Sequence, residues 1–274
     1  MDNEIIAKET ALSVAKETAK DVYADAVQPT AKNVGGFFGT LSGFFNHVVM
    51  YPLKKINTKY EQKAIAFEKE MECKYNSIPE QDQVEPQLHI VGPTMESLKY
   101  NIMDDDLAEL FSNLLVSDMD AKTQNLCTPA FVKVIEQLSP SDAKVFRNIF
   151  NECSQKETLP ICTVALYKNG DEKNRIRKEY LPQYLVSTEV DGLSSNDVSK
   201  SIQNLERLGL LNTNFLNWHT DDALYSKLID TDFIRSITLW ASEITGNTYV
   251  AKVGLKGVLE LNDFARDFAK VCLR

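Results

Sequence analysis

The pattern that most constrains the fold of this chain lies in residues 193–213, LSSNDVSKSIQNLERLGLLNT. Ser194 and Asp197 have the spacing of a helix capping box, so we expect a helix to begin there. Apolar residues then recur every three or four positions, as on the buried face of a helix, at Val198, Ile202 and Leu205. Gly209 supplies a helix stop, and an extended segment follows from Leu210. The pattern predicts a capped amphipathic helix that passes directly into a strand.

This helix and strand resemble the third helix and the first wing strand of winged-helix domains. An earlier strand is predicted at Leu159–Tyr167, and the second wing strand at Val258–Leu261. Between the wing strands, an insertion near 216–250 contains a predicted helix near 221–244. A closing helix over Asn262–Leu273 completes the expected winged-helix-like α+β unit.

The rest of the chain has helical patterns. Helices are predicted at about 93–101, 105–119, 129–138 and 140–152. Asp104, Asp105 and Asp106 are assigned a capping role at the start of the second, and Thr128 and Ser139 are expected to be the N-caps of the last two. Before them come an Ala-rich repeat within residues 7–26 and a polar helix with an apolar face at Ile56, Tyr60, Ala64, Phe67 and Met71.

Residues 76–87, NSIPEQDQVEPQ, contain two prolines and form the clearest linker in the sequence. We therefore predict a mainly α protein in three parts. They are an N-terminal helical region (1–77), a helical middle region (78–152) and the winged-helix-like domain (153–274).

Charge and cysteine usage narrow the class of protein. The formal charge is −9, and residues 77–130 hold ten acidic residues against two lysines. No region is basic enough to indicate general nucleic-acid binding. The five cysteines include no CxxC pair, which argues against a disulfide framework or a zinc knuckle. The opening MDNEIIAKET lacks the features of a secretory signal, so we expect a cytoplasmic location.

Residues 33–53, NVGGFFGTLSGFFNHVVMYPL, contain no charged residue. Small side chains are spaced by four and bulky ones lie beside them, at Gly35, Gly39, Gly43, Phe37 and Phe44. Two interpretations stay open. The glycine ridge could pack a helix closely against the Ala-rich helix in water, or it could contact a membrane with flanking lysines at the surface. Polar residues such as Asn46 and His47 lower the hydropathy and favour the first interpretation.

The predicted helix of residues 195–208 has an outward face that could contact a partner. It carries Lys200, Gln203, Asn204 and Arg207, and a second basic cluster includes Arg175 and Arg177. These residue types can contact bases or phosphates. Nearby carboxylates at Asp197 and Glu206 nearly cancel the charge, so a protein contact is favoured over DNA.

Signatures of catalysis are missing from the sequence. The three histidines are far apart, and no phosphate-binding, dinucleotide-binding or nucleophile-elbow motif occurs. We therefore expect no enzymatic activity, no catalytic residues, no cofactor and no metal, although a site assembled from distant residues remains an alternative.

Several motifs together resemble the bacterial abortive-infection alpha family. They are Tyr23–Pro29 with the glycine segment, Ile78–Pro79, Val84–Pro86, Ile90–Pro93, Asp106–Leu115, Ser117–Asp120, Pro129–Phe131, Gln137–Ala143 and Leu261–Phe268 with Cys272. The closing motif has Asn262 and Ala265 where the family pattern has Thr-Pro and Gly, which affects the turn there. The resemblance implies a role in defence against phage, by arrest or death of the infected cell, and it transfers no catalytic residues.

The leading hypothesis is thus a non-enzymatic anti-phage defence protein that acts through a protein partner or self-association. A membrane-active effector using residues 33–53 and a winged-helix DNA-binding regulator are the alternatives.

Overall fold

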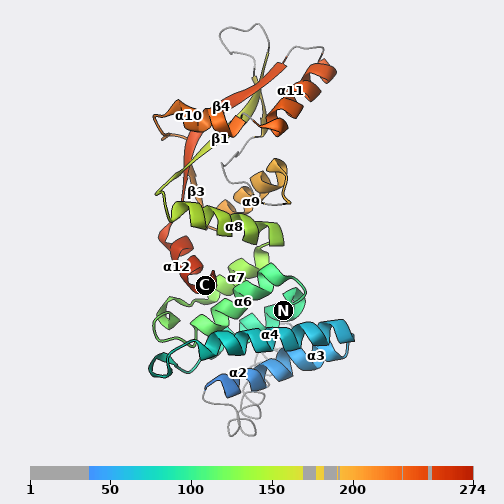
Figure 1. Cartoon of the computed structure of the whole chain (residues 1–274), viewed down its shortest axis with the longest axis vertical. Coiled ribbons are helices and arrows are strands. Elements are labelled where there is room, and N and C mark those ends of the chain that lie inside the picture. The colour runs from blue at the N-terminus through green and yellow to red at the C-terminus, as the bar shows by residue number, and fades with distance from the viewer. Residues whose placement is uncertain are drawn as a thin grey trace, which may run out of the picture. The chain divides into compact units, whose positions relative to one another are not determined.

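The computed structural model describes residues 37–168, 177–181, 190, 192–229, 231–245 and 249–273. The Ala-rich repeat, Gly35 and Arg175 lie outside these residues. The fold is mainly helical, as predicted (Figure 1). The described residues fall into two compact units, one up to Glu136 together with the residues from Lys270, and one over Gln137–Ala269.

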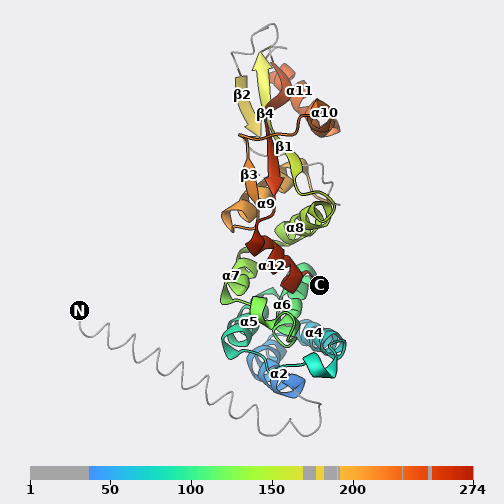
Figure 2. The ribbon, with the colours of Figure 1, turned by 90° about the vertical axis from the view of Figure 1, so that its left-hand side faces the viewer.

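The first unit is all-helical. Its elements are α2 (Phe37–Phe45), the π-helical turn η1 (Asn46–Met50), α3 (Tyr51–Lys54), α4 (Thr58–Asn76), the 3-10 turn η2 (Glu80–Asp82), α5 (Leu88–Asn101), α6 (Asp105–Ser117), the 3-10 turn η3 (Gln124–Leu126) and α7 (Pro129–Gln137). Helix α6 is its centre, since all of its residues from Leu107 to Ser117 except Glu109 are buried. Figure 2 shows α4 and α5 beside it.

The capping predictions hold for α6 and α8 and are wrong for α7. The Asp104 carboxylate accepts from the backbone N–H of Leu107 at 3.0 Å. Ser139 forms a capping box with Asp142 at the start of α8 (Pro140–Cys153). The Thr128 hydroxyl, by contrast, is buried and makes no hydrogen bond within the described part of the chain. The backbone N–H of Phe131 donates instead to the Thr128 carbonyl at 3.0 Å.

The predicted linker does not separate two parts of the structure. Residues on both sides of it lie in the first unit. The Tyr75 hydroxyl donates to Gln83 Oε1 at 2.6 Å, and the Val84 N–H donates to the Met119 carbonyl at 3.0 Å. The prolines prevent an α-helix here, as expected. The extended backbone nevertheless forms hydrogen bonds with the loop that follows α6, so it is not a linker without contacts.

The second unit combines helices with a four-stranded antiparallel sheet. Its remaining elements are β1 (Leu159–Lys168), β2 (Arg177–Leu181), α9 (Ser195–Arg207), β3 (Asn212–Asn214), α10 (Asp222–Ile229), α11 (Asp232–Thr245), β4 (Tyr249–Glu260) and α12 (Asp263–Cys272). The strand order is β2-β1-β4-β3. The unit begins at Gln137 and not at the predicted residue 153, because α8 packs on α9. The last turn of α12 belongs to the first unit.

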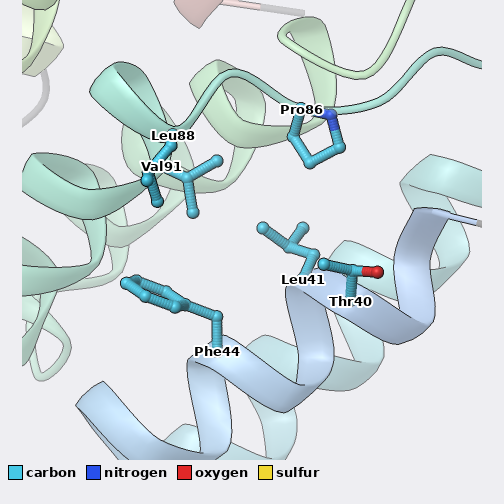
Figure 3. A pocket seen from close by; sticks show the side chains of 6 residues that line it. All are labelled: Thr40, Leu41, Phe44, Pro86, Leu88 and Val91. Atoms are coloured by element: carbon cyan, nitrogen blue, oxygen red, sulfur yellow. The ribbon is translucent and has the colours of Figure 1, made fainter. Parts of the chain in front are cut away.

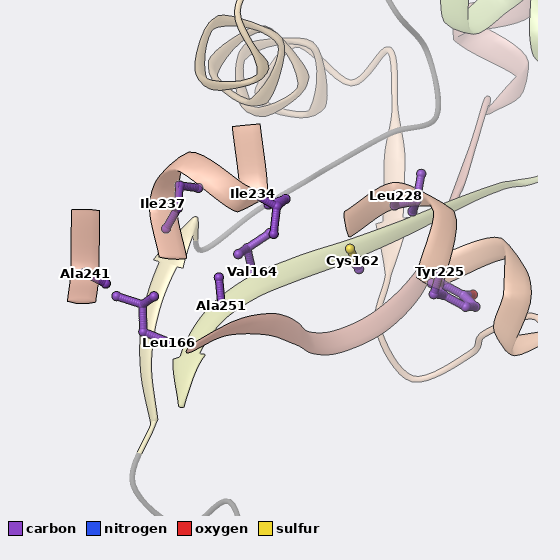
Figure 4. Packing of buried hydrophobic residues seen from close by; sticks show 9 residues of the cluster. All are labelled: Cys162, Val164, Leu166, Tyr225, Leu228, Ile234, Ile237, Ala241 and Ala251. Carbon is purple, nitrogen blue, oxygen red and sulfur yellow. The ribbon is translucent and has the colours of Figure 1, made fainter. Parts of the chain in front are cut away.

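The long β1–β4 pair supports different partners at its two ends. At the end that contains Leu159, β4 also pairs with β3, whereas at the end that contains Tyr167, β1 also pairs with β2. The predicted single helix of the insertion is two helices, α10 and α11, which cover one face of the sheet. Figure 4 shows their inward side chains packed on that face, and the cluster comprises Cys162, Val164, Leu166, Tyr225, Leu228, Ile234, Ile237, Ala241 and Ala251.

Helix α9 begins and ends as the sequence predicts. The Ser194 hydroxyl accepts from the backbone N–H of Asp197 at 3.2 Å. Gly209 adopts φ of +75°, a conformation that glycine reaches at little cost, and β3 starts three residues later. The helix buries Val198, Ile202 and Leu205, the stripe expected from periodicity.

Candidate functional site

The polar face of α9 is partly used inside the second unit. The Asn204 side-chain amide donates to the Asp142 carboxylate at 2.8 Å and to the Gln137 carbonyl at 3.1 Å. Arg207 donates to the Gln137 side chain at 3.0 Å and to Asn204 Oδ1 at 2.7 Å. Two of the four predicted contact residues therefore join α9 to Gln137, the last residue of α7, and to Asp142 in the first turn of α8.

The other two predicted residues of this face remain at the surface. Lys200 and Gln203 are exposed, and the Lys200 ammonium lies 3.5 Å from the Asp197 carboxylate one turn earlier. The Ser194 hydroxyl and Lys200 hold the pKa of Asp197 below its ordinary value, so this carboxylate stays ionised. Arg177 is the first residue of β2 and lies opposite Tyr167. The α9 surface thus offers a mixed charge pattern rather than a positive field.

The described part of the uncharged run, residues 37–53, packs together with Lys54 as a helical segment on α4 and α5. We call α2, η1 and α3 together the cover segment. Gly39, Gly43 and Phe44 are buried, whereas Phe37 is 38% exposed. The segment buries much of its apolar surface against protein, whereas the Ala-rich repeat, against which the glycine ridge is predicted to pack, lies outside the described residues. The described helices include none that is both long enough and apolar enough to cross a membrane.

Two aromatic pairs and one carboxylate join the cover segment to α4. The Phe45 and Phe67 rings stack with centroids 5.6 Å apart, and the Phe38 and Tyr75 rings stack at 5.4 Å. The half-buried Glu68 carboxylate accepts from the Ser42 hydroxyl and, at 3.4 Å, from the Asn46 amide.

A small apolar pocket remains between the cover segment and α5. Figure 3 shows Thr40, Leu41 and Phe44 of α2 facing Pro86, Leu88 and Val91 across it. Leu88 is 42% exposed at its edge. Neither Glu68 nor this pocket was identified from the sequence, and no local motif marks them because they arise where separate helices meet.

Helix α11 has exposed apolar residues, which were not predicted from the sequence. Leu239, Trp240 and Ile244 are 65%, 47% and 66% exposed. We call these three residues the α11 patch. Ile234, Ile237 and Ala241 of the same helix are buried against the sheet. Trp240 and Ile244 are four residues apart, so their helical spacing was a usable signal.

Asp118 is a buried carboxyl in the loop after α6. Its side chain is fully buried, and burial raises its pKa to about 7. One oxygen accepts from the backbone N–H of Gln87 at 2.7 Å, while the other has no hydrogen-bond partner within the described residues. Asp118 is also the C-cap of α6, at the end of the helix dipole that disfavours negative charge. This carboxyl is therefore poised to change its protonation state near neutral pH.

Comparison with known proteins places this arrangement in a family. The model of the family described as abortive infection alpha matches residues 59–272. The chain belongs to the abortive infection alpha family. The resemblance seen in the motifs from Ile78 onward is thereby confirmed, whereas Tyr23–Pro29 and the glycine segment precede the matched residues. The family assignment indicates a role in abortive infection and phage defence. The match includes α4 and α5 but not the cover segment.

Other comparisons add little to the abortive infection alpha assignment. Among curated proteins, none matches the chain significantly. One solved structure is similar, that of an uncharacterised protein from the hydrocarbon-degrading marine bacterium Alcanivorax borkumensis SK2. The two are 9% identical, the alignment covers 56% of this chain and 96% of that one, and the TM-score is 0.29. A similarity of this size carries no argument about function.

Proposed function

We propose that the protein is a non-enzymatic defence protein of abortive infection that acts by binding a protein partner. The α11 patch carries this proposal. Its three large apolar side chains lie on one exposed stretch of helix, although burying such side chains normally stabilises a protein. Clustered exposed apolar residues often mark interaction sites, and tryptophan is enriched among residues that dominate binding energy.

The chemistry of α9 supports a protein partner over DNA. A helix that reads DNA needs unengaged polar side chains and a positive field along the phosphates. Asn204 and Arg207 are hydrogen-bonded to Gln137 and Asp142, and Lys200 lies beside Asp197. DNA binding by this face would require breaking contacts that join α9 to α8.

The winged-helix-like interpretation is part of the same proposal. The strand that follows α9 pairs with β4, and β4 also pairs with β1. This β1-β4-β3 order, with α9 leading into β3 through Gly209, is the arrangement expected for a wing next to a third helix. Because winged helices also serve in protein contacts, this likeness by itself does not choose between partners.

Phage plating and crosslinking test the proposal together. In cells expressing the protein, the double substitution Trp240→Ala with Ile244→Ala is expected to reduce protection by roughly tenfold or more, because it removes the main apolar contact. Glu243→Ala, at an exposed position between the two, is the matched control and should protect normally. A photoreactive residue at position 239 should crosslink to one defined protein during infection. Full protection by the double variant, with no specific crosslink, would refute the proposal.

Contact with a membrane surface is a second candidate function. Tyr51 at the start of α3 and Ile56 just beyond its end are 61% and 59% exposed, and Lys54 and Lys55 lie between them. Aromatic and aliphatic side chains beside lysines suit the interface of an anionic bilayer. Dye release or sedimentation with anionic vesicles tests this candidate, and Tyr51→Ser with Ile56→Ser should abolish any effect.

A further inference from the structure

The family match begins at residue 59, so the helices that receive the cover segment belong to the matched region while the cover segment does not. The receiving surface, which we call the seat, is formed by Phe67, Glu68 and Tyr75 of α4 and by Leu88 and Val91 of α5. We propose that the seat is a helix-binding site, that the cover segment occupies it in cis, and that an amphipathic helix of a partner protein replaces it.

The contacts of the cover segment follow the mode in which a helix binds an apolar surface. Phe38, Leu41, Phe45 and Val49 are buried and lie at spacings of three and four along the segment. Anchors at this spacing are those of an amphipathic helix in a groove. The partner helix is therefore expected to carry aromatic or large aliphatic residues at the same spacing and a small polar residue that reaches Glu68.

Few polar contacts hold the cover segment in place. Glu68 bonds to Ser42 and Asn46, and an ion pair of 3.3 Å joins Lys54 to Glu61. Lys54 is 65% exposed, and ion pairs at such sites contribute little to stability. Apart from this ion pair, Glu68 is consequently one of two polar links between the described segment and α4, the other being Tyr75, whose hydroxyl is hydrogen-bonded to the backbone of Phe38 and Phe37.

Two features of the segment itself favour release. A π-helical turn, Asn46–Met50, interrupts the regular hydrogen bonding between α2 and α3, and such turns are rare and often lie at functional sites. The pocket beside Thr40 shows that α2 does not fill the seat at α5. A partner helix with a larger side chain at the position of Thr40 would gain contacts that the cover segment lacks.

This inference rests on the proposed function, because it names the kind of protein partner. It predicts a quantitative link between two measurements. If a helix in trans binds only when the cover segment has left, its apparent affinity rises in proportion to the fraction of open molecules. Hydrogen exchange of residues 37–54 reports that fraction, and titration with a labelled peptide of residues 37–55, fused to a soluble tag, reports the affinity.

Two variants of the full chain should change the fraction of molecules with a released cover segment in opposite directions. Glu68→Ala removes the hydrogen bonds to Ser42 and Asn46 and should raise both the exchange of residues 37–54 and the peptide affinity by roughly three- to tenfold. Thr40→Leu fills the pocket and should lower both by a similar factor. Glu70→Ala is the matched control, because the Glu70 partner is Lys74 on the same helix. The control should change neither measurement, and a peptide with Leu41→Asp should not bind.

Three results would overturn the inference. Residues 37–54 could exchange only together with α6, which would make the segment part of the core. The peptide could fail to bind the Glu68→Ala protein despite increased exchange. The opened segment could bind anionic vesicles and no peptide, which would favour the membrane candidate. If the peptide does not bind but a photoreactive residue at position 239 crosslinks to one protein, this inference is refuted and the proposed function is left intact. If the peptide binds but no partner is crosslinked, the proposed function alone is refuted.

Discussion

The side-chain amide of Asn113, near the end of α6, donates to the backbone carbonyl of Cys272 at 2.9 Å, although 159 residues separate them in the sequence. One helical turn later, the Ser117 hydroxyl donates to the Val271 carbonyl, also at 2.9 Å. The last carbonyls of a helix have no partner within the helix. Two buried side chains of α6 thus satisfy the end of α12.

Removing either donor should destabilise the protein. Asn113→Ala and Ser117→Ala each leave a buried carbonyl without its partner, and we expect a loss of about 1–3 kcal/mol in the free energy of unfolding. Denaturation by urea measures this loss. Ser154→Ala is the control, since its exposed hydroxyl bonds only to Phe150 in its own helix, and it should cost less. Equal losses at all three positions would contradict the interpretation.

Asp118 should make stability depend on pH. Its pKa is about 7 in the folded protein against an ordinary value of 3.8, so the folded state favours the protonated carboxyl. The stability that this group contributes is complete at pH values below 3.8 and is lost as the pH rises through 7. Between pH 5 and 8 the loss should be about 1–3 kcal/mol.

Asp118→Asn should remove most of this loss, since the amide cannot ionise and its oxygen can still accept from Gln87. Urea denaturation at pH 5 and pH 8 measures the difference. Asp105→Asn, at an 85% exposed side chain, should retain the pH dependence of the unsubstituted protein. An Asp118→Asn protein as sensitive to pH as the parent would show that other groups are responsible.

Two glycines should respond differently to alanine. A Cβ at Gly254 in β4 would overlap Thr163 Oγ1, which accepts from the Leu255 N–H, so Gly254→Ala should destabilise by about 1–3 kcal/mol. A Cβ at Gly92 in α5 would meet no atom within 4 Å outside its own stretch of helix, but the following Pro93 disfavours the helical conformation of a residue that has a Cβ. Gly92→Ala should therefore change the stability by less than about 1 kcal/mol. Thermal unfolding distinguishes these outcomes. Adding Thr163→Ala should recover part of the Gly254→Ala loss, and strict additivity would argue against the overlap.

Thiol reactivity should separate Cys73 from the other cysteines. Cys73 is exposed, whereas Cys127, Cys153, Cys162 and Cys272 are buried, and burial raises the pKa of Cys153 to about 11. A chromogenic disulfide reagent should therefore modify one thiol quickly in the native protein and the remaining four on unfolding. Cys73→Ser should eliminate the fast reaction. A fast reaction that persists in this variant would mean that a buried site opens readily.

Local signals in the sequence were sufficient for most helices and strands. Ser194 and Gly209 act on the backbone next to them, so the start and end of α9 could be predicted without knowledge of the rest. The hydrogen-bond partners of the Asn204 side chain depend on where α8 packs, and no local sequence pattern encodes that packing. Likewise, the glycine spacing in residues 33–53 is compatible with protein or lipid as the surroundings, and only the contacts with Phe67 and Glu68 identify protein for the described residues.

The candidate surfaces were harder to predict for a related reason. Helix α11 has both buried and exposed apolar residues, and the four-residue spacing of Trp240 and Ile244 does not by itself show that these two are exposed while Ile234 and Ile237 are buried. The boundary near 153 was misplaced because a change from helix to strand marks a change of secondary structure, not of unit. The prolines of residues 76–87 similarly indicated an irregular backbone but not the strand-like pairing that it makes with the loop after α6.

The bonds from Asn113 and Ser117 to α12 have a consequence for synthesis. A ribosome makes α6 early, yet the carbonyls that these two side chains bind belong to residues made about 150 positions later. During translation, the Asn113 amide and the Ser117 hydroxyl lack these bonds until Val271 and Cys272 have emerged from the ribosome. A polypeptide cut short before those residues would therefore lack the complete first unit, so prematurely terminated products should be poorly folded and readily degraded.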